Sequence, residues 1–361
     1  MRSKILLFSL TLIILASLLS SCVGGSTGVA SSWPGLTANG GLVYLASGQH
    51  VYAIDYANGS EKWRFPSEAL KNTEFYAPPA LTADGQLIIG SFNHKLYSVD
   101  AASGTQRWVF EGAKDRYIAG PLVTDKAIYA PSSDGNLYAL DLNGKLLWTF
   151  TTEGAIWATP STYAECDCVY ISSMDHHVYV ADSDTGRQLW QSETLGGSVI
   201  GSPTFDAENM LLFVGTFDKE IVALDVQNGQ IEWRVPTDER VWSAPLLVDG
   251  TLYFGDAAGY FYSLSATNGA QNWKIQPLPG SSIVGTPILA GETIYFTSES
   301  ESVYGVNAAG TVDRTFSIAA KLYTSPVWVG DKLLVAEMGG DALLVALNEN
   351  GAQQWAFAPA K

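Results

Sequence analysis

Charge, cysteine and sustained helical periodicity are all scarce in this chain of 361 residues. Its 20 basic residues are outnumbered by 36 acidic ones, so the basic patches that bind DNA, RNA or anionic lipid are missing and nucleic acid is not an expected partner. No stretch keeps the apolar period of a helix over a dozen residues. Catalytic signatures such as Gly-x-Ser-x-Gly, His-Glu-x-x-His or a phosphate-binding glycine loop are also lacking. These absences favour a non-catalytic protein of many short strands.

One largely apolar run, residues 5–19, follows two basic residues near the start of the chain. Its 15 residues are short for a membrane span, which needs about 20, and fit a signal peptide over residues 1–21. The run ends in Leu-Ser-Ser-Cys, which resembles a bacterial lipobox with Cys22 as the lipidation site; the alternative is a simple signal peptide before an incidental cysteine. Residues 22–32 predict a flexible tether. We therefore expect the protein to be exported and anchored to the cell membrane or outer membrane by its lipid. This N-terminal lipid is its only expected contact with a membrane.

A pattern of Asp, Gly and Trp repeats along the rest of the chain. In one copy, Asp225 can accept backbone N–H bonds in a turn, Gly229 can take the positive φ that closes it, and Trp233 offers a large apolar face. The tryptophans from Trp63 to Trp273 are 45, 40, 42, 43 and 40 residues apart, and Arg314 stands where the next is expected. Two further copies are Asp55, Gly59 and Trp63, and Asp100, Gly104 and Trp108.

A second marker, proline, recurs in phase with the first: Pro34, Pro79, Pro121, Pro160, Pro203, Pro245, Pro287 and Pro326. Each unit fits four short strands, which in the sixth unit are expected over residues 243–248, 251–255, 260–264 and 270–275. Four antiparallel strands per unit of about 40 residues make a propeller blade. The sequence thus predicts an all-β, eight-bladed β-propeller over residues 33–361, as one domain and a monomer. The repeats run in phase from Pro34 to Trp355 and show no obvious strand exchanged between the ends, which leaves open how the ring closes.

The Ala-x-Asp-x-x-x-Gly-x-x-x-Trp pattern resembles the PQQ-like, or quinoprotein-type, propeller repeat. A lipoprotein of this length that consists only of a propeller is most similar to the BamB-like lipoproteins of outer-membrane β-barrel assembly. The resemblance implies a non-catalytic scaffold that binds other cell-envelope proteins or peptides through loops on one face, without a cofactor.

Two other functions remain open. The first is a ligand-binding or sensor propeller for a glycan or peptide. The second is a PQQ-dependent dehydrogenase, because the same fold hosts such enzymes. Enzymes of that group are usually much longer, carry adjacent cysteines against the quinone and hold Ca²⁺ near the axis. This chain has no Cys-Cys pair, so the dehydrogenase is the less favoured hypothesis.

Aromatic residues alternate with smaller ones three positions before the prolines. Even-numbered units have Tyr76, Trp157, Trp242 and Tyr323, whereas odd-numbered units have Ser31, Ile118, Ile200 and Val284. We expect this position at the rim of the central channel, where the four aromatic residues would form a collar that binds an extended peptide, a sugar or a flat ligand. Arg116, Arg240 and Glu239 are the expected polar partners. The alternative is that large side chains simply fill the wide axis at every second blade.

Cys166, Cys168 and the histidines are the remaining candidates for metal chemistry. Two thiols at i and i+2 share one face of a strand, and His176 and His177 follow in the next turn. The favoured interpretation is structural: two small residues in a turn that an oxidising compartment can join. His50 and His94 occupy equivalent turns in other blades, too far apart to share an ion, and we expect no metal site.

Overall fold

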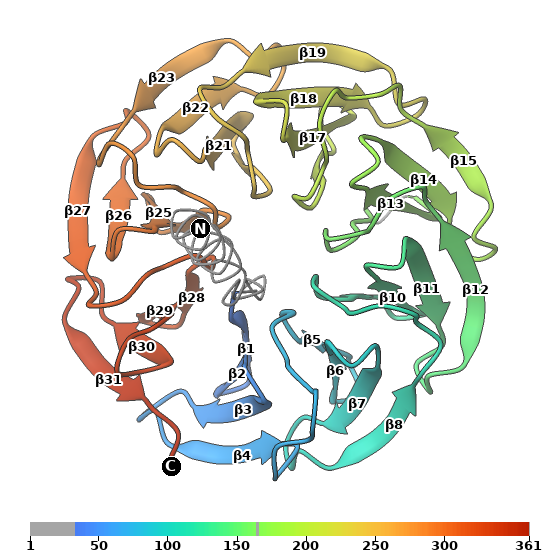
Figure 1. Cartoon of the computed structure of the whole chain (residues 1–361). Coiled ribbons are helices and arrows are strands. Elements are labelled where there is room, and N and C mark those ends of the chain that lie inside the picture. The colour runs from blue at the N-terminus through green and yellow to red at the C-terminus, as the bar shows by residue number, and fades with distance from the viewer. Residues whose placement is uncertain (1–32, 164–165, 361) are drawn as a thin grey trace, which may run out of the picture. The chain divides into compact units, whose positions relative to one another are not determined.

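The computed structural model describes residues 33–163 and 166–360, and the chain from Trp33 onward forms one compact unit. The predicted signal peptide, Cys22 and the tether lie outside these residues. The strands form eight separate antiparallel sheets that follow one another in chain order around a ring (Figure 1). The predicted eight-bladed all-β propeller is therefore confirmed. Within the described ranges, no helix has the length and apolar character needed to cross a bilayer.

We number the sheets as blades 1 to 8 in chain order. Blades 1 to 4 contain β1 Gly35–Asn39, β2 Leu42–Ser47, β3 His50–Asp55 and β4 Glu61–Phe65; β5 Ala80–Leu81, β6 Gln86–Gly90, β7 Leu96–Asp100 and β8 Gln106–Phe110; β9 Leu122–Val123, β10 Ile128–Pro131, β11 Asn136–Leu140 and β12 Leu146–Thr151; and β13 Cys168–Ser172, β14 Val178–Asp182 and β15 Gln188–Gln191. Figure 1 shows the fourth strands β4, β8 and β12 on the outer circumference of the ring.

Blades 5 to 8 contain β16 Thr204–Asp206, β17 Leu211–Thr216, β18 Glu220–Asp225 and β19 Ile231–Pro236; β20 Leu246–Val248, β21 Thr251–Gly255, β22 Phe261–Ser265 and β23 Gln271–Ile275; β24 Ile288–Ala290, β25 Thr293–Ser298, β26 Ser302–Val306 and β27 Val312–Ser317; and β28 Val327–Val329, β29 Lys332–Ala336, β30 Leu344–Leu347 and β31 Gln353–Phe357. The strands of blade 6 lie within a few residues of their predicted bounds.

Blade 4 departs from the expected four strands, because its innermost strand is reduced to one β-bridge between Ser161 and Tyr170. The Thr162 hydroxyl donates to the Cys168 carbonyl at 2.7 Å on this edge. The two backbone bonds between Ser161 and Tyr170 are what remains of the pairing on this edge.

The two middle strands of each blade are buried on both faces, since another blade packs against each side. All six residues of β17 are buried, whereas β23 on the circumference alternates exposed and half-buried residues. A typical core between blades 5 and 6 joins Phe213 and Ile221 to Phe254 and Tyr262. The hydrophobic core is therefore divided into layers between neighbouring blades, which we call seams.

Seven of the eight seams are latched at their outer end by the tryptophan of the repeat. The Trp233 indole Nε1 of blade 5 donates to the Ala266 carbonyl of blade 6 at 3.1 Å, one residue after the turn residue Ser265. Equivalent bonds run from Trp63 to Ala101, Trp108 to Leu142, Trp148 to Ser183, Trp190 to Val226, Trp273 to Ala308, and Trp355 to Tyr56. The repeat is thus a contact between blades as well as a turn within one.

The glycine of the repeat serves both purposes. Asp225 Oδ1 accepts the N–H groups of Gln227 at 2.8 Å and Asn228 at 3.2 Å, and Gly229 closes the turn with φ of +72°. A Cβ atom on Gly229 would lie 2.5 Å from the Trp190 ring of the preceding blade. Only glycine therefore meets both the backbone and the packing requirement at this position.

The ring closes between blade 8 and blade 1 by the same kind of seam, without an exchanged strand. The Trp355 Nε1 donates to the Tyr56 carbonyl at 2.9 Å, and the Tyr56 hydroxyl donates to the Val329 carbonyl at 2.6 Å. Behind these bonds, Leu36 and Ile54 pack with Leu334 and the other buried residues of blade 8.

The seam between blades 7 and 8 is the exception. Arg314 replaces the tryptophan, and its guanidinium donates to the Glu349 carbonyl, the acceptor that an indole would use elsewhere. Phe316, two residues later on β27, covers Gly351 in place of an indole, since a Cβ there would lie 2.1 Å from its ring. The hydrogen bond of the latch is kept, but the large flat side chain is lost.

Candidate functional site

The segments that connect consecutive blades lie against the turns between second and third strands, on one face of the ring. The Ser133 N–H donates to the Arg116 carbonyl at 3.0 Å, and the Phe217 N–H donates to the Ser198 carbonyl at 3.0 Å. Asp134 reinforces this contact by accepting the Lys114 N–H at 2.7 Å and the Tyr138 hydroxyl at 2.7 Å. Burial raises the pKa of Asp134, but these hydrogen bonds outweigh it and hold the pKa below its usual value. The predicted collar residues sit on this face.

Tyr76 and Arg116 meet on a shared phenylalanine. The Tyr76 ring lies 5.3 Å from the Phe92 ring, and the Arg116 guanidinium carbon lies 5.3 Å above the same ring. Arg116 Nε is buried and finds no hydrogen-bond partner among the described residues. This is a cation–π contact, worth about 0.5–2 kcal/mol depending on exposure.

Trp242 and Arg240 repeat the arrangement on the far side of the ring. The Trp242 ring lies 4.7 Å from Phe217, and the Arg240 guanidinium carbon lies 5.6 Å above Phe217. Glu239 pairs with Lys219 at 3.1 Å, and its pKa is lowered by the Arg240 N–H bond and by Lys219. Both arginines of the predicted site therefore lie over an aromatic ring from the preceding blade.

Phe92 and Phe217 were missed by the sequence reasoning. Phe92 stands two residues after the end of β6 and Phe217 one residue after the end of β17, in the tetrads Gly90-Ser91-Phe92-Asn93 and Gly215-Thr216-Phe217-Asp218. This recurrence was the available signal. The sequence prediction considered only the polar residues of these turns, and it therefore did not include Phe92 and Phe217 as the aromatic partners of Arg116 and Arg240.

Trp33, the first described residue, connects two members of the collar. Its ring stacks on Tyr323 at 5.5 Å with an interplanar angle of 13° and meets Trp242 edge-on at 5.3 Å. Trp157 is held separately, by an indole Nε1 bond to the Ser133 hydroxyl at 3.1 Å. Trp33 therefore joins Trp242 and Tyr323. Tyr76 instead packs on Phe92, and Trp157 bonds to Ser133.

Tyr323, which stacks on Trp33, also contacts the charged pair of Glu299 and Lys321. Its hydroxyl donates to Glu299 at 2.7 Å, and Lys321 pairs with the same carboxylate at 2.9 Å. The hydrogen bonds from Tyr323 and Lys321 lower the pKa of Glu299, and burial raises that of Tyr323. The collar thus offers half-buried aromatic faces beside guanidinium, ammonium and carboxylate groups. Such groups can contact an extended peptide through ring faces and charged hydrogen bonds.

The candidates for metal chemistry have structural contacts instead. Cys166 and Cys168 are joined in a disulfide, so their sulfurs are not free as thiolate ligands. The ring nitrogens Nδ1 of His50 and His177 bond the Pro66 and Ser192 carbonyls at 2.7 and 2.9 Å. Within the described ranges, no three His, Cys, Asp or Glu side chains gather as a metal would require.

Comparison with known proteins places the chain among propellers. Residues 76–357 match the family described as "Beta-alanine-activating enzyme, beta-propeller". Outer membrane protein assembly factor BamB of Moranella endobia is 26% identical over 239 residues, which are 62% of this chain and 60% of that protein. The quinoprotein alcohol dehydrogenase PedH of Pseudomonas putida is 25% identical over 41% of this chain, but only 26% of its own length is matched. The chain therefore spans less than two thirds of each of these relatives.

Solved structures agree on the fold. BamB from Moraxella catarrhalis superposes with a TM-score of 0.72 at 18% identity and covers 84% of this chain and 92% of that chain. The computationally designed Ika8 protein reaches 0.73 at 14% identity and covers 92% of this chain and 98% of that chain. At these identities the superpositions establish the ring and its blades, and nothing about ligands or partners.

Proposed function

We propose that this chain, which belongs to the family described as "Beta-alanine-activating enzyme, beta-propeller", is a non-catalytic scaffold of the cell envelope. The premise is that it is a PQQ-like propeller of the BamB type. It binds other envelope proteins through the collar face and assists outer-membrane protein assembly. A lipid on Cys22 holds the ring at a membrane.

The observation that supports the proposal most is the recurrence of one relative. BamB from Moranella endobia, Legionella pneumophila and Shewanella oneidensis matches at 26%, 27% and 28% identity, and each carries the name of an assembly factor. A scaffold needs a rigid ring and an adhesive face. The latched seams provide the first, and the aromatic and arginine side chains of the collar provide the second, because Trp, Tyr and Arg dominate binding energy at protein interfaces.

The test is an affinity pull-down of the full-length protein from its own cells. The variant Trp157→Ala/Trp242→Ala removes two collar faces, and Leu147→Ala, which truncates a half-exposed side chain on β12, is the matched control. We expect barrel-assembly proteins with the wild type and the control, and their loss with the double variant. Recovery of the same partners by all three proteins, or of none by any, would contradict the proposal.

Lipid anchoring has its own test. The variant Cys22→Ser removes the thiol that would carry the acyl chains, each buried CH₂ of which contributes about 0.8 kcal/mol to membrane binding. We expect the wild type in the membrane fraction and the variant in the soluble fraction. A variant that still sediments with membranes would show that Cys22 is not the anchor.

A quinoprotein enzyme is the second candidate, because the PedH relative aligns over 163 residues. Such a function needs a bound quinone, which absorbs in the near ultraviolet. We expect no such band after incubation of the full-length protein with PQQ and Ca²⁺ followed by gel filtration. A retained band would favour the enzyme over the scaffold.

A further inference from the structure

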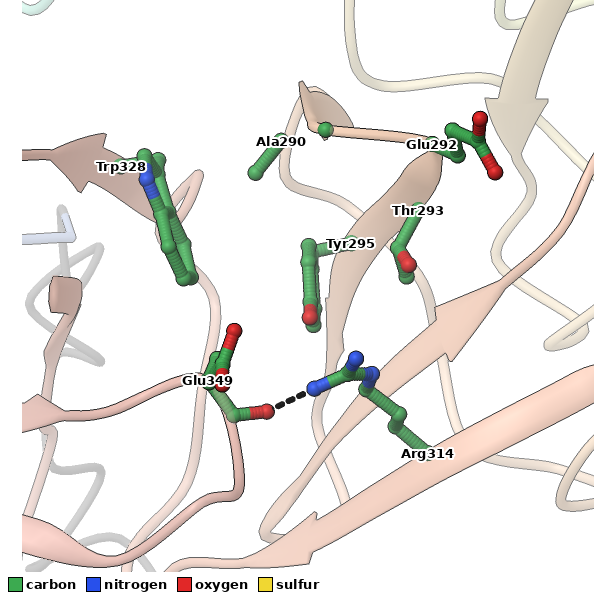
Figure 2. Close-up of a pocket in the computed structure, with 8 residues that line it drawn as sticks. Ala290, Glu292, Thr293, Tyr295, Arg314, Trp328 and Glu349 are labelled. Atoms are coloured by element: carbon green, nitrogen blue, oxygen red, sulfur yellow. Dashed lines mark hydrogen bonds between the residues drawn. The ribbon is translucent and has the colours of Figure 1, made fainter. Parts of the chain in front are cut away.

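The seam between blades 7 and 8 contains a pocket of about 350 Å³, lined by residues of β24, β25, β27, β28 and the turn before β31. We call it the seam pocket; it is lined by Ala290, Gly291, Glu292, Thr293, Tyr295, Arg314, Trp328 and Glu349 (Figure 2). It lies where the repeat has Arg314 in place of its tryptophan. A volume near 300 Å³ is at the lower end of small-molecule sites and suits a ligand of one or two rings.

One wall of the seam pocket is aromatic and fixed in place. The Trp328 ring stacks on Tyr295 at 5.8 Å with an interplanar angle of 18°, and Tyr295 is in turn stacked on Phe316 at 6.4 Å. Trp328 Nε1 donates to the Gly330 carbonyl at 3.0 Å, which fixes the indole further. Trp328 stands two residues after Pro326, where blades 6 and 7 have Leu247 and Leu289. Blade 5 also has an aromatic residue at this position, Phe205, but its ring stacks on Tyr163 at 4.0 Å, whereas Trp328 lines the seam pocket.

The opposite wall is polar. Figure 2 shows Arg314 reaching from β27 to the Glu349 backbone, beneath the ring of Tyr295. A guanidinium has five N–H donors, so this one carbonyl leaves most of them for a ligand. The carboxylates of Glu292 and Glu349 have no ion pair or side-chain hydrogen bond within the described part of the chain, and neither does the Thr293 hydroxyl. The pocket thus offers hydrogen-bond donors on Arg314, acceptors on Glu292 and Glu349, and the Thr293 hydroxyl, which can both donate and accept.

The chemistry of the lining selects among ligand classes. An aromatic side chain of a peptide would cover Arg314 and the carboxylates without pairing them, which costs free energy. A ligand of either charge would meet a like charge in the lining, Arg314 for a cation and Glu292 and Glu349 for an anion, so neither matches all three groups. A neutral sugar ring has hydroxyl groups that donate to carboxylates and accept from a guanidinium, and its C–H face can lie on an indole.

We propose that the seam pocket is a binding site for a neutral saccharide, which stacks on Trp328 and hydrogen-bonds to Arg314, Glu349 and Glu292. The site is separate from the collar, because no collar residue lines it and its residues share no contact with Trp157 or Trp242 among the hydrogen bonds and ring pairs of the described residues. It therefore adds a ligand to the ring and does not depend on the scaffold function.

Saturation-transfer NMR on the full-length protein tests this with a panel of free neutral mono- and disaccharides. Any detergent must lack a sugar headgroup, because such a headgroup would compete. We expect signals from the C–H protons of one ring face for at least one saccharide. Two variants should raise its Kd at least tenfold: Arg314→Trp, which restores the residue of the other seams and fills the pocket, and Trp328→Leu, which installs the residue of the neighbouring blades.

Controls separate this site from the collar and from misfolding. Trp157→Ala should bind the saccharide like the wild type. Circular dichroism checks that each variant is folded, and if Arg314→Trp does not fold, Trp328→Leu alone decides. The proposal is overturned if no saccharide of the panel binds, if binding survives both folded variants, or if only acidic sugars, quaternary ammonium compounds or tryptophan-containing peptides bind.

Discussion

The seam between blades 5 and 6 and the seam between blades 7 and 8 start from the same repeat but end on different side chains. In the first, Trp233 bonds to the next blade, and its ring and Val235 together cover the turn glycine, Gly269. In the second, Arg314 makes the bond and Phe316 alone covers the equivalent glycine, Gly351. The comparison shows that the hydrogen bond between blades and the packing over the turn glycine can come from different side chains. The seam pocket lies at the seam where they do.

The largest effect is expected from Trp233→Ala. The change removes both the indole bond and the packing of a large side chain between blades, and we expect a loss of about 3–5 kcal/mol in the free energy of unfolding. Denaturant titration followed by tryptophan fluorescence measures it. An unchanged midpoint would mean that the indole does not latch the seam.

Next is Gly229→Ala, which tests the glycine that faces the Trp190 latch. Its φ of +72° and the 2.5 Å approach of the Trp190 ring both oppose a Cβ, so we expect a loss of about 2–4 kcal/mol. Gly250→Ala is the matched control, since it has φ of +70° but no heavy atom within 4 Å of its Cβ position. Equal losses for the two variants would show that only the backbone conformation matters.

A smaller loss is expected from Arg314→Ala. The guanidinium contributes one charged hydrogen bond to the seam between blades 7 and 8 without the packing of an indole, so about 1–2 kcal/mol is the expected cost. The same titration measures it. A loss as large as that of Trp233→Ala would mean that the two latches are equivalent after all.

The smallest effect concerns the rim end of the same seam and depends on pH. Tyr323 and Lys321 lower the pKa of Glu299 from its ordinary value of 4.5, so its contribution to stability is present above that value and is lost as the pH falls through the lowered pKa. The pair is partly exposed, which limits the contribution to about 1 kcal/mol or less. Glu299→Gln should therefore reduce stability near neutral pH and flatten its fall in acid. Parallel pH curves for the two proteins would argue against this pairing.

The sequence by itself determined the number of blades, the order of their strands and the turn of each repeat. These features are local: an Asp that accepts nearby N–H groups, a Gly with positive φ and an alternation of apolar residues all act within about 15 residues. The same periodicity also indicated that the seventh tryptophan was missing at Arg314. The reduced inner strand of blade 4 was not foreseen, because Pro160 stands at the same position as the prolines of the seven blades whose inner strand forms.

Only the tertiary structure decided which residues face one another. The tryptophan of one blade meets the glycine of the next, about 40 residues later, and the turn pattern alone does not say which blade it touches. The collar position was chosen from spacing, yet its contacts with Trp33, Phe92 and Phe217 come from segments that the ring brings together. The seam pocket has the same origin, since Trp328 and Arg314 meet only when blade 8 packs on blade 7. A repeat fixes each blade through local forces, whereas its sites arise from packing between blades.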